Sequence, residues 1–251
     1  MRIAVIGGTG LAGRHTVEAL RRAGHEPVAV ARATGVDVLT GEGLDDALEG
    51  VEAVVDASNH FADEPAEAIA LFGAATEILL AAEQRAGVRH HVLLSILGLD
   101  RIEGNAHYAG KRRQEGLMAE SPVAATIVRA AQFHEFAETV VARTRRGGEA
   151  AVAPLLMQPV AAADVGAVLA EVAAGPALGR APDLAGPQPE DLVDMARRVM
   201  AAKGDPIRLL PSWRGGVFGP EAAGEVLLPA PGARLAATTF DAWLGARFPG
   251  P

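Results

Sequence analysis

The chain has 251 residues, of which 49% are apolar and none is cysteine, and its formal net charge is −8. This length predicts one sizeable domain rather than two, and the lack of cysteine excludes disulfides, thiolate metal sites and a cysteine nucleophile. The acidic balance argues against broad nucleic-acid binding. Because we find neither a signal-peptide pattern nor a run approaching about twenty apolar residues, we expect a cytoplasmic protein with no membrane partner.

The first predicted element is a short apolar strand, Arg2 to Ile6, that runs directly into a glycine-rich turn. Gly7 permits the tight turn, Gly10 lets the backbone approach a pyrophosphate, and Gly13 lets the next helix lie close to the strand. An amphipathic helix follows, and its N–H groups and partial positive charge favour an anion at its start. The turn therefore predicts a dinucleotide site. Its predicted ligands are Gly7, Thr9, Gly10, Leu11, Ala12 and Gly13.

Strands and helices alternate along the rest of the first half. The further predicted strands are 25–31, 37–39, 52–57, 91–95 and 125–129, and the predicted helices are 44–48, 65–86 and 108–119. Such alternation demands right-handed crossovers and predicts an α/β fold with a doubly wound parallel Rossmann sheet. In these sheets ligands bind beyond the carboxyl ends of the strands. The segments expected to converge there are 7–13, 31–34, 57–60 and 95–98.

Prolines crowd the second half of the chain, which favours loops over regular elements. We predict a single domain over 1–251, in which 1–130 form the dinucleotide-binding core and 160–186 return to it. Segments 131–159 and 187–251 are predicted to form a small, loop-rich substrate-capping region without a core of its own.

Several motifs together resemble the atypical short-chain dehydrogenase/reductases, and within them the NmrA-like NAD(P)-binding branch. They are GGTGLAG at 7–13, HVLLSILGLD at 91–100, HYAGKRRQE at 107–115, IVRAAQFHEF at 127–136 and PVAAADVGAVLAEVA at 159–173. The resemblance covers most of the chain. It implies a nicotinamide cofactor and places Asp37 and Val38 beside the adenine, and Ala57, Ser58 and Asn59 along the nicotinamide ribose.

The end of the second strand indicates which nicotinamide cofactor is preferred. An acidic residue here accepts hydrogen bonds from the ribose in NAD-binding folds, whereas a cation accommodates the extra phosphate of NADP. This chain has Arg32, followed by Thr34, and Arg14 could assist from the first helix. NADP(H) is therefore predicted over NAD(H). The alternative is that Arg32 is an ordinary solvent-facing residue.

The predicted catalytic residues are Ser95, His107, Tyr108 and Lys111. The related dehydrogenases combine a serine with a tyrosine and a lysine four residues apart on a helix, where the two side chains share a face. Ser95 and Lys111 match this pattern, but the tyrosine position holds His107 and the single tyrosine is next to it. His107 is a proton donor, an orienting residue, or a residue left after the chemistry was lost. Lys111 and Ser95 are also predicted cofactor ligands.

The segment QFHEF at 132–136 follows the last core strand and is predicted to face the substrate. Phe133 supplies an apolar wall, and His134, like His107, is a candidate substrate ligand. The histidines at 25, 90 and 91 precede strands at the opposite edge and are interpreted as structural. No metal site is predicted.

Two function classes remain open. One is an NADP(H)-dependent oxidoreductase acting on a small, apolar carbonyl, quinone or enone. The other is a non-catalytic NADP(H)-binding sensor, which the loss of tyrosine at position 107 favours, and a nucleotide-sugar epimerase is a weaker third. The expected partner is a small-molecule substrate. The sequence leaves open the substrate's identity, the direction of hydride transfer, and whether the protein is a monomer or a homodimer.

Overall fold

A computed structural model describes residues 1–214 and 217–249, which are built around one parallel sheet. Neighbouring strands follow the order β13 (Arg234–Leu235), β10 (Leu184–Ala185), β5 (Ala125–Ala130), β4 (His90–Ile96), β3 (Ala53–Asp56), β1 (Arg2–Ile6) and β2 (Glu26–Val30). The short strand β9 (Gly179–Arg180) also pairs with β5. The order reverses at β1, which pairs with β2 on one side and with β3 on the other. This is the predicted Rossmann-type α/β fold.

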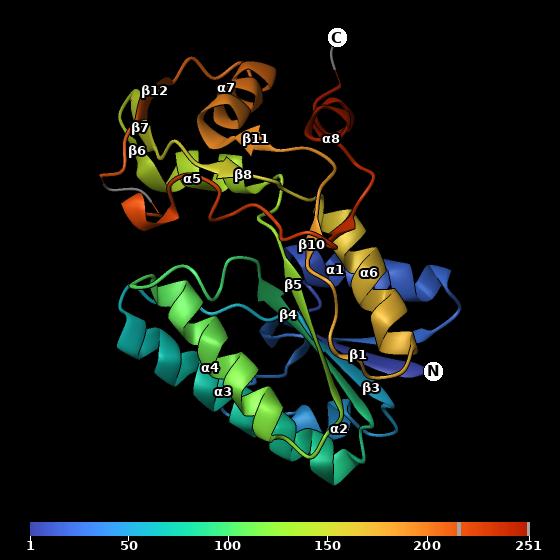
Figure 1. The fold of residues 1–251 in the computed structure, drawn as a ribbon. Helices are drawn as coiled ribbons and strands as arrows, with labels where there is room; N and C mark the ends of the chain where they lie inside the picture. Colours follow the sequence, from blue (N-terminus) through green and yellow to red (C-terminus); the bar gives the residue numbers. More distant parts are fainter. Residues whose placement is uncertain (215–216, 250–251) are drawn as a thin grey trace.

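Helices cover both faces of the sheet (Figure 1). The long helix α3 (Pro65–Ala86) runs beside α4 (Ala106–Glu120) on one face, and α1 (Leu11–Arg22) packs with α6 (Ala162–Ala174) on the other. The short α2 (Leu44–Ala47) contacts α3. Helix α6, from the second half of the chain, therefore packs against α1 of the first half.

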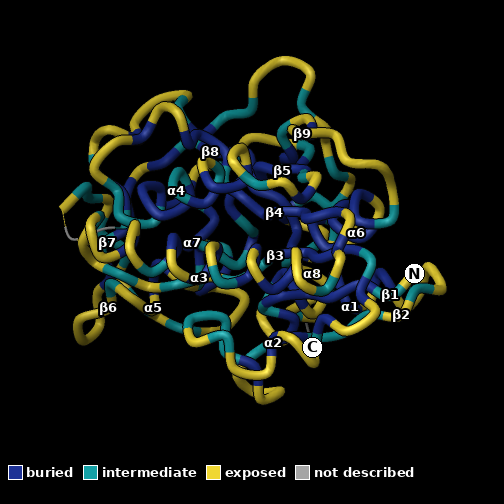
Figure 2. Tube along the Cα trace, turned by 90° about the horizontal axis from the view of Figure 1, so that it is seen from below, coloured by how far each residue is buried: buried dark blue, intermediate teal, exposed yellow. Residues whose placement is uncertain are grey.

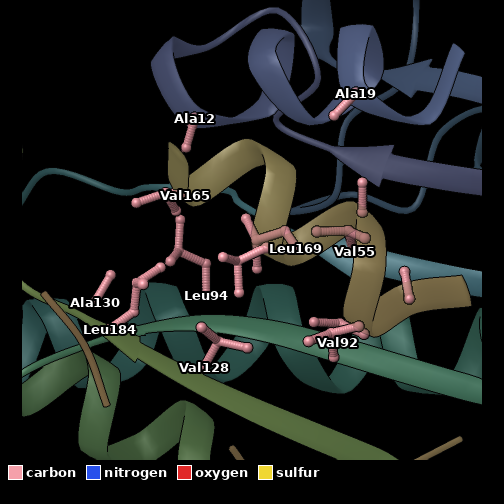
Figure 3. Packing of buried hydrophobic residues seen from close by; sticks show 14 of the residues in the cluster. Ala12, Ala19, Val55, Val92, Leu94, Val128, Ala130, Val165, Leu169 and Leu184 are labelled. Carbon is pink, nitrogen blue, oxygen red and sulfur yellow. The ribbon is translucent and has the colours of Figure 1, made fainter. Parts of the chain in front are cut away.

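Apolar strands buried on both faces explain why the sheet is parallel and central. Figure 2 shows the strands β3 and β4 as buried trace at the centre of the molecule, with exposed loops around them. On one side, Leu94 and Val55 meet Val165 and Leu169 of α6 (Figure 3). On the other, Leu93 packs in a separate cluster with α3 and α4.

Among the described residues, α3 is the one helix whose length and composition would suffice to cross a membrane. Its exposed residues are interrupted by buried ones such as Phe72 and Leu79, which pack inside the molecule. A helix in the core of a protein can be equally long and apolar, so this finding gives no support for a membrane span.

The predicted strand at 37–39 is wrong. Asp37 forms only an isolated antiparallel bridge with Glu42, and the Asp37 side chain accepts a hydrogen bond from the backbone N–H of Leu39. Glycines 35, 41 and 43 all have positive φ, between 72° and 83°, so the chain turns repeatedly instead of extending. As a result β2 is an edge strand of the sheet.

The predicted absence of a core in the capping region is also wrong. This region contains α5 (Phe136–Thr144), α7 (Leu192–Ala202) and α8 (Phe240–Arg247), with one small sheet of β12 (Arg208–Pro211), β7 (Glu149–Val152) and β6 (Arg145–Arg146) and another of β8 (Leu156–Met157) and β11 (Glu190–Asp191). The amphipathic α7 and its neighbours bury a cluster of large side chains. They include Val140, Val152, Met157, Met195, Val199, Phe218 and Phe240. Prolines are compatible with this core because they lie mostly between the elements.

Candidate functional site

The glycine-rich turn connects β1 to α1 and has the predicted steric requirements. Gly7 has a φ of +72°, and a Cβ there would lie 2.8 Å from the carbonyl oxygen of Ala57. A Cβ on Gly13 would lie 2.1 Å from the carbonyl oxygen of Gly7, so α1 can approach the turn only because residue 13 is glycine. Gly10 donates its backbone N–H to Gly7 across the turn, at 2.8 Å.

The N-terminus of α1 is open toward solvent. Thr9 and Gly10 are exposed, and Leu11 is half-buried. Within the described residues no side chain caps this helix, and its first turn carries no acidic residue. Uncapped N–H groups at a helix start attract anions, so the backbone of residues 10–13 can hold a diphosphate.

The segment after β2 forms a short 3-10 helix, η1 (Arg32–Thr34). Arg32 is exposed there, and no hydrogen bond or ion pair engages its guanidinium in residues 1–214 and 217–249. The Thr34 hydroxyl instead donates to the carbonyl oxygen of Ala31 at 2.8 Å and accepts from the Ala31 N–H. Arg32 is therefore available to an anion, whereas Thr34 shapes the turn. Arg14 is exposed on α1, and Asp37 and Val38 are half-buried.

The loop after β3 lies directly beside the glycine-rich turn. Asp56 ends the strand, is buried, and accepts hydrogen bonds from the backbone N–H of Ser58 and from Nε2 of Gln114. Ala57 and Ser58 are half-buried and Asn59 is exposed; their contact with a ribose stays a prediction.

The Ser95 hydroxyl is hydrogen-bonded to Glu115, a residue that is not among the predicted site residues. This hydroxyl donates to Oε1 of Glu115 at 2.5 Å, and Glu115 also accepts from Arg129 on β5. Arg129 further pairs with Asp100, beyond the end of β4. The bond to Glu115 takes up the only proton of the Ser95 hydroxyl, so this oxygen is oriented as an acceptor.

Lys111 lies inside the molecule, with 5% of its surface exposed. Its Nζ donates to the carbonyl oxygen of Leu94 at 2.9 Å and lies 5.3 Å from the centre of the Phe72 ring. Burial lowers the pKa of Lys111 to about 8, although Asp56 and Glu115 oppose this shift. The ammonium group is therefore still mostly charged at pH 7.

The two candidate proton donors lie in different surroundings. His107 is half-buried beside Phe72, and burial together with Lys111 lowers its pKa to about 3. It is a neutral imidazole at pH 7. Tyr108 is 1% exposed, donates its hydroxyl to the Leu97 carbonyl oxygen at 3.2 Å and accepts from Gln132 at 3.0 Å. Burial raises the pKa of Tyr108 well above its usual value, so the hydroxyl is held as a structural hydrogen-bonding group.

The segment after β5 places Phe133 and His134 in different surroundings. Phe133 is half-buried and packs on the sheet core. His134 is 1% exposed, its Nε2 lies 3.2 Å from the carbonyl oxygen of Thr238, and its ring packs on Phe240 and Trp243. His134 thus joins the C-terminal helix α8 to the end of β5, and its role toward a substrate stays a prediction.

Three further residues contact the predicted catalytic residues or their neighbours but are not among the predicted site residues: Phe72, Gln114 and Glu115. Gln114 and Glu115 lie three and four positions after Lys111, a spacing that puts all three on one helix face. That spacing could have found them. Phe72 could not be found this way, because its place between α3 and α4 depends on their packing. In the described part of the chain no group of acidic or histidine side chains could hold a metal ion.

Two of the histidines interpreted as structural are bonded to neighbouring side chains. His91 and Glu83 form a fully buried ion pair at 2.8 Å, and His90 is bonded to the Thr126 hydroxyl. Both contacts lie near the amino ends of β4 and β5, opposite the glycine-rich turn.

Comparison with known proteins shows to which protein family the chain belongs. The profile of an NAD(P)H-binding family matches residues 7–176, which is more than half of the sequence, and the chain belongs to this family. A comparison with curated proteins finds no match.

Solved structures with a similar fold include three nicotinamide-binding proteins. An NADPH-dependent quinone oxidoreductase of Escherichia coli, complexed with NADPH, has 19% identity and a TM-score of 0.63 over 84% of this chain and 78% of its own. A short-chain dehydrogenase/reductase superfamily protein of Agrobacterium tumefaciens with bound NAD has 19% identity and a TM-score of 0.66 over 98% and 95%. The dTDP-4-dehydrorhamnose reductase of Bacillus anthracis with NADP has 14% identity and a TM-score of 0.72 over 97% of each chain. These similarities confirm the Rossmann-like fold.

Proposed function

We propose that the protein is an NADP(H)-dependent oxidoreductase that reduces a small, apolar acceptor, with a quinone as the preferred class. The observation that carries the cofactor preference is the exposed guanidinium of Arg32 at the end of β2, which has no partner among the residues that the structure describes. Arg32 can bind a phosphate through two parallel N–H bonds. The NAD and NADP complexes among the similar structures support a nicotinamide cofactor without deciding between the two.

The residues present suit such a cofactor. The backbone of residues 10–13 would hold the diphosphate, because a Cβ is missing where α1 approaches the turn and the helix start is uncapped. Ala57 to Asn59 would line the ribose, and the buried ammonium of Lys111 would supply a positive charge at the nicotinamide end of the site. When bound, the nicotinamide supplies a hydride.

The chemistry of the acceptor follows from the protein's proton donors. Neutral His107 and the hydrogen-bonded Tyr108 are poor acids at pH 7. A quinone suits this site because it accepts the two electrons of a hydride as a delocalised hydroquinone anion, and the remaining proton then comes from water. An isolated ketone would form an alkoxide and needs an acid at the moment of transfer. Half-buried Phe133 and Phe136 supply apolar surface for such a ring.

A non-catalytic NADP(H) sensor is the second candidate. It is favoured by the extent to which side chains at the nicotinamide end bind each other, in particular Ser95 to Glu115 and Tyr108 to Gln132. A small-molecule ligand and a cytoplasmic location belong to both proposals.

Oxidation of NADPH, followed by its fluorescence over a panel of quinones, enones and simple ketones, tests the proposal. We expect consumption with quinones that exceeds consumption with simple ketones by at least about tenfold. The variant His25→Gln, changed at the opposite end of the sheet, is the matched control and should behave as the parent. NADPH binding without consumption of any acceptor would identify the sensor, and absence of binding would remove both proposals.

A further inference from the structure

The loop after β3 carries a histidine at the point where the strand order reverses. Nucleotides bind at this point in doubly wound sheets, because the loops after the two diverging strands leave a crevice between them. Here those strands are β1 and β3, which pair from Ile3 to Ile6. The close approach of Gly7 to Ala57 places the loop beside the glycine-rich turn, and His60 follows three residues later.

The His60 ring packs against a neighbouring aromatic ring, but one of its nitrogen atoms has no hydrogen-bond partner among the described residues. The ring meets the Phe72 ring edge-on, with 5.1 Å between centroids. The Nε2 atom is buried and has no hydrogen-bond partner among the residues that the structure describes. A buried, unsatisfied ring nitrogen is unfavourable and is rare in folded proteins unless a ligand or water completes it.

The charged groups that act on His60 come from four separate segments of the chain. Asp56 acts on it from the end of β3, Lys111 from α4, Arg32 from η1, and Asp37 from the turn that follows. The neutral imidazole of His107 also packs on the Phe72 ring, with 5.6 Å between centroids. Arg32 marks the adenosine end of the proposed cofactor site and Lys111 the nicotinamide end. The part of a dinucleotide that lies between its two nucleosides is the diphosphate.

We propose that His60 is a cofactor-binding residue, whose Nε2–H donates a hydrogen bond to the dinucleotide diphosphate and whose ring takes up a proton as this anion binds. This inference rests on the nucleotide binding of the proposed function. It assigns to the chain a side-chain ligand for the diphosphate, in addition to the backbone of the glycine-rich turn.

The direction of the pH dependence follows from the surroundings of the ring. Burial lowers the pKa of His60 below 6.5 in the free protein, more than Asp56 and Asp37 raise it, so the ring is neutral at pH 7. A bound diphosphate adds negative charge and raises this pKa. Binding therefore takes up a proton and becomes tighter as the pH falls from about 8 to 6, and the gain ends below the pKa of the free ring.

Calorimetric titration of the protein with NADP⁺, in buffers that differ in ionisation enthalpy, measures this proton uptake directly. His60→Gln keeps an N–H donor at a similar reach but cannot be protonated, and His60→Phe keeps an aromatic ring against Phe72 but has no donor. Protons taken up by the 2′-phosphate of the ligand are common to the parent and its variants, so the difference isolates His60. His25→Gln is the control for replacing a histidine far from the crevice.

We expect the parent and His25→Gln to take up at least about 0.3 more protons per nucleotide at pH 7 than either His60 variant. The Kd of the parent should fall about fivefold more than that of His60→Gln between pH 8 and pH 6, and His60→Phe should bind at least about fivefold more weakly than the parent at pH 7. Equal proton uptake by the parent and the His60 variants overturns the role of His60, with nucleotide binding intact. A parent that binds no nucleotide overturns the proposed function itself, and this inference with it.

Discussion

The two ends of the proposed cleft are built in different ways. At the phosphate end, the groups offered to a ligand are backbone N–H groups of residues 10–13 and the exposed cation Arg32. At the nicotinamide end, Ser95, Tyr108 and Lys111 are each hydrogen-bonded to another part of the protein. The first end is open to a ligand, whereas the second is largely satisfied internally.

This difference shows what a motif can and cannot indicate. A glycine motif acts through the absence of side chains, so its effect survives wherever the strand, turn and helix form. A serine, tyrosine or lysine motif acts through side-chain orientation, which neighbouring residues can redirect. Here Glu115 takes the Ser95 hydroxyl and Gln132 contacts the Tyr108 hydroxyl. The sequence motifs therefore specify nucleotide binding at this site more directly than they specify a catalytic reaction.

The largest effect is expected from Gly13→Ala at the phosphate end. The added Cβ would lie 2.1 Å from the carbonyl oxygen of Gly7, so α1 must move away from the turn. We expect a loss of about 3 kcal/mol of stability, seen as a fall in Tm of roughly 6–12 °C, together with loss of NADPH binding. Gly116→Ala is the matched control, because it lies in α4 with open space around it, and it should not lower Tm. A Gly13→Ala protein with unchanged Tm and affinity would contradict the close approach of α1.

The second effect concerns the exposed cation of the same end. Arg32→Ala should weaken NADPH binding by more than about tenfold, because a charge-assisted hydrogen bond contributes about 1.5–3 kcal/mol, and it should change NADH binding by less than about twofold. Fluorescence titration with both nucleotides measures this. Arg22→Ala, at the exposed C-terminal end of α1, is the control for loss of a surface arginine. Equal losses for both nucleotides would mean that Arg32 does not distinguish them.

The smallest effect is expected at the nicotinamide end. Tyr108→Phe removes the hydroxyl that donates to Leu97 and accepts from Gln132, which should cost about 1–2 kcal/mol and lower Tm by roughly 2–8 °C. Quinone reduction by the folded variant should keep its kcat/KM within about twofold. A tenfold slower reaction at unchanged Tm would instead make Tyr108 the proton donor and remove the contrast between the two ends.

Most of the fold could be predicted from local patterns, and the exceptions have physical causes. The helix over 65–86 is found with its predicted bounds, because Pro65 starts it and Gly87 ends it. The strand predicted at 37–39 fails because three nearby glycines with positive φ let the chain turn. The core of the capping region was missed because its residues are scattered between prolines and meet only after α5, α7 and the segment around Phe218 pack together.

Sequence alone determined the strand, glycine turn and helix that make the protein a member of an NAD(P)H-binding family, and it singled out Arg32. These features depend on backbone conformation and on residues adjacent in the chain. Only the tertiary structure decided that Tyr108 is hydrogen-bonded inside the protein, that Glu115 holds Ser95, and that the Nε2 of His60 is buried without a hydrogen-bond partner among the described residues. Such outcomes depend on which side chains meet across elements distant in sequence. Spacing along one helix can show which residues share a face, but not which side chains of other elements they meet.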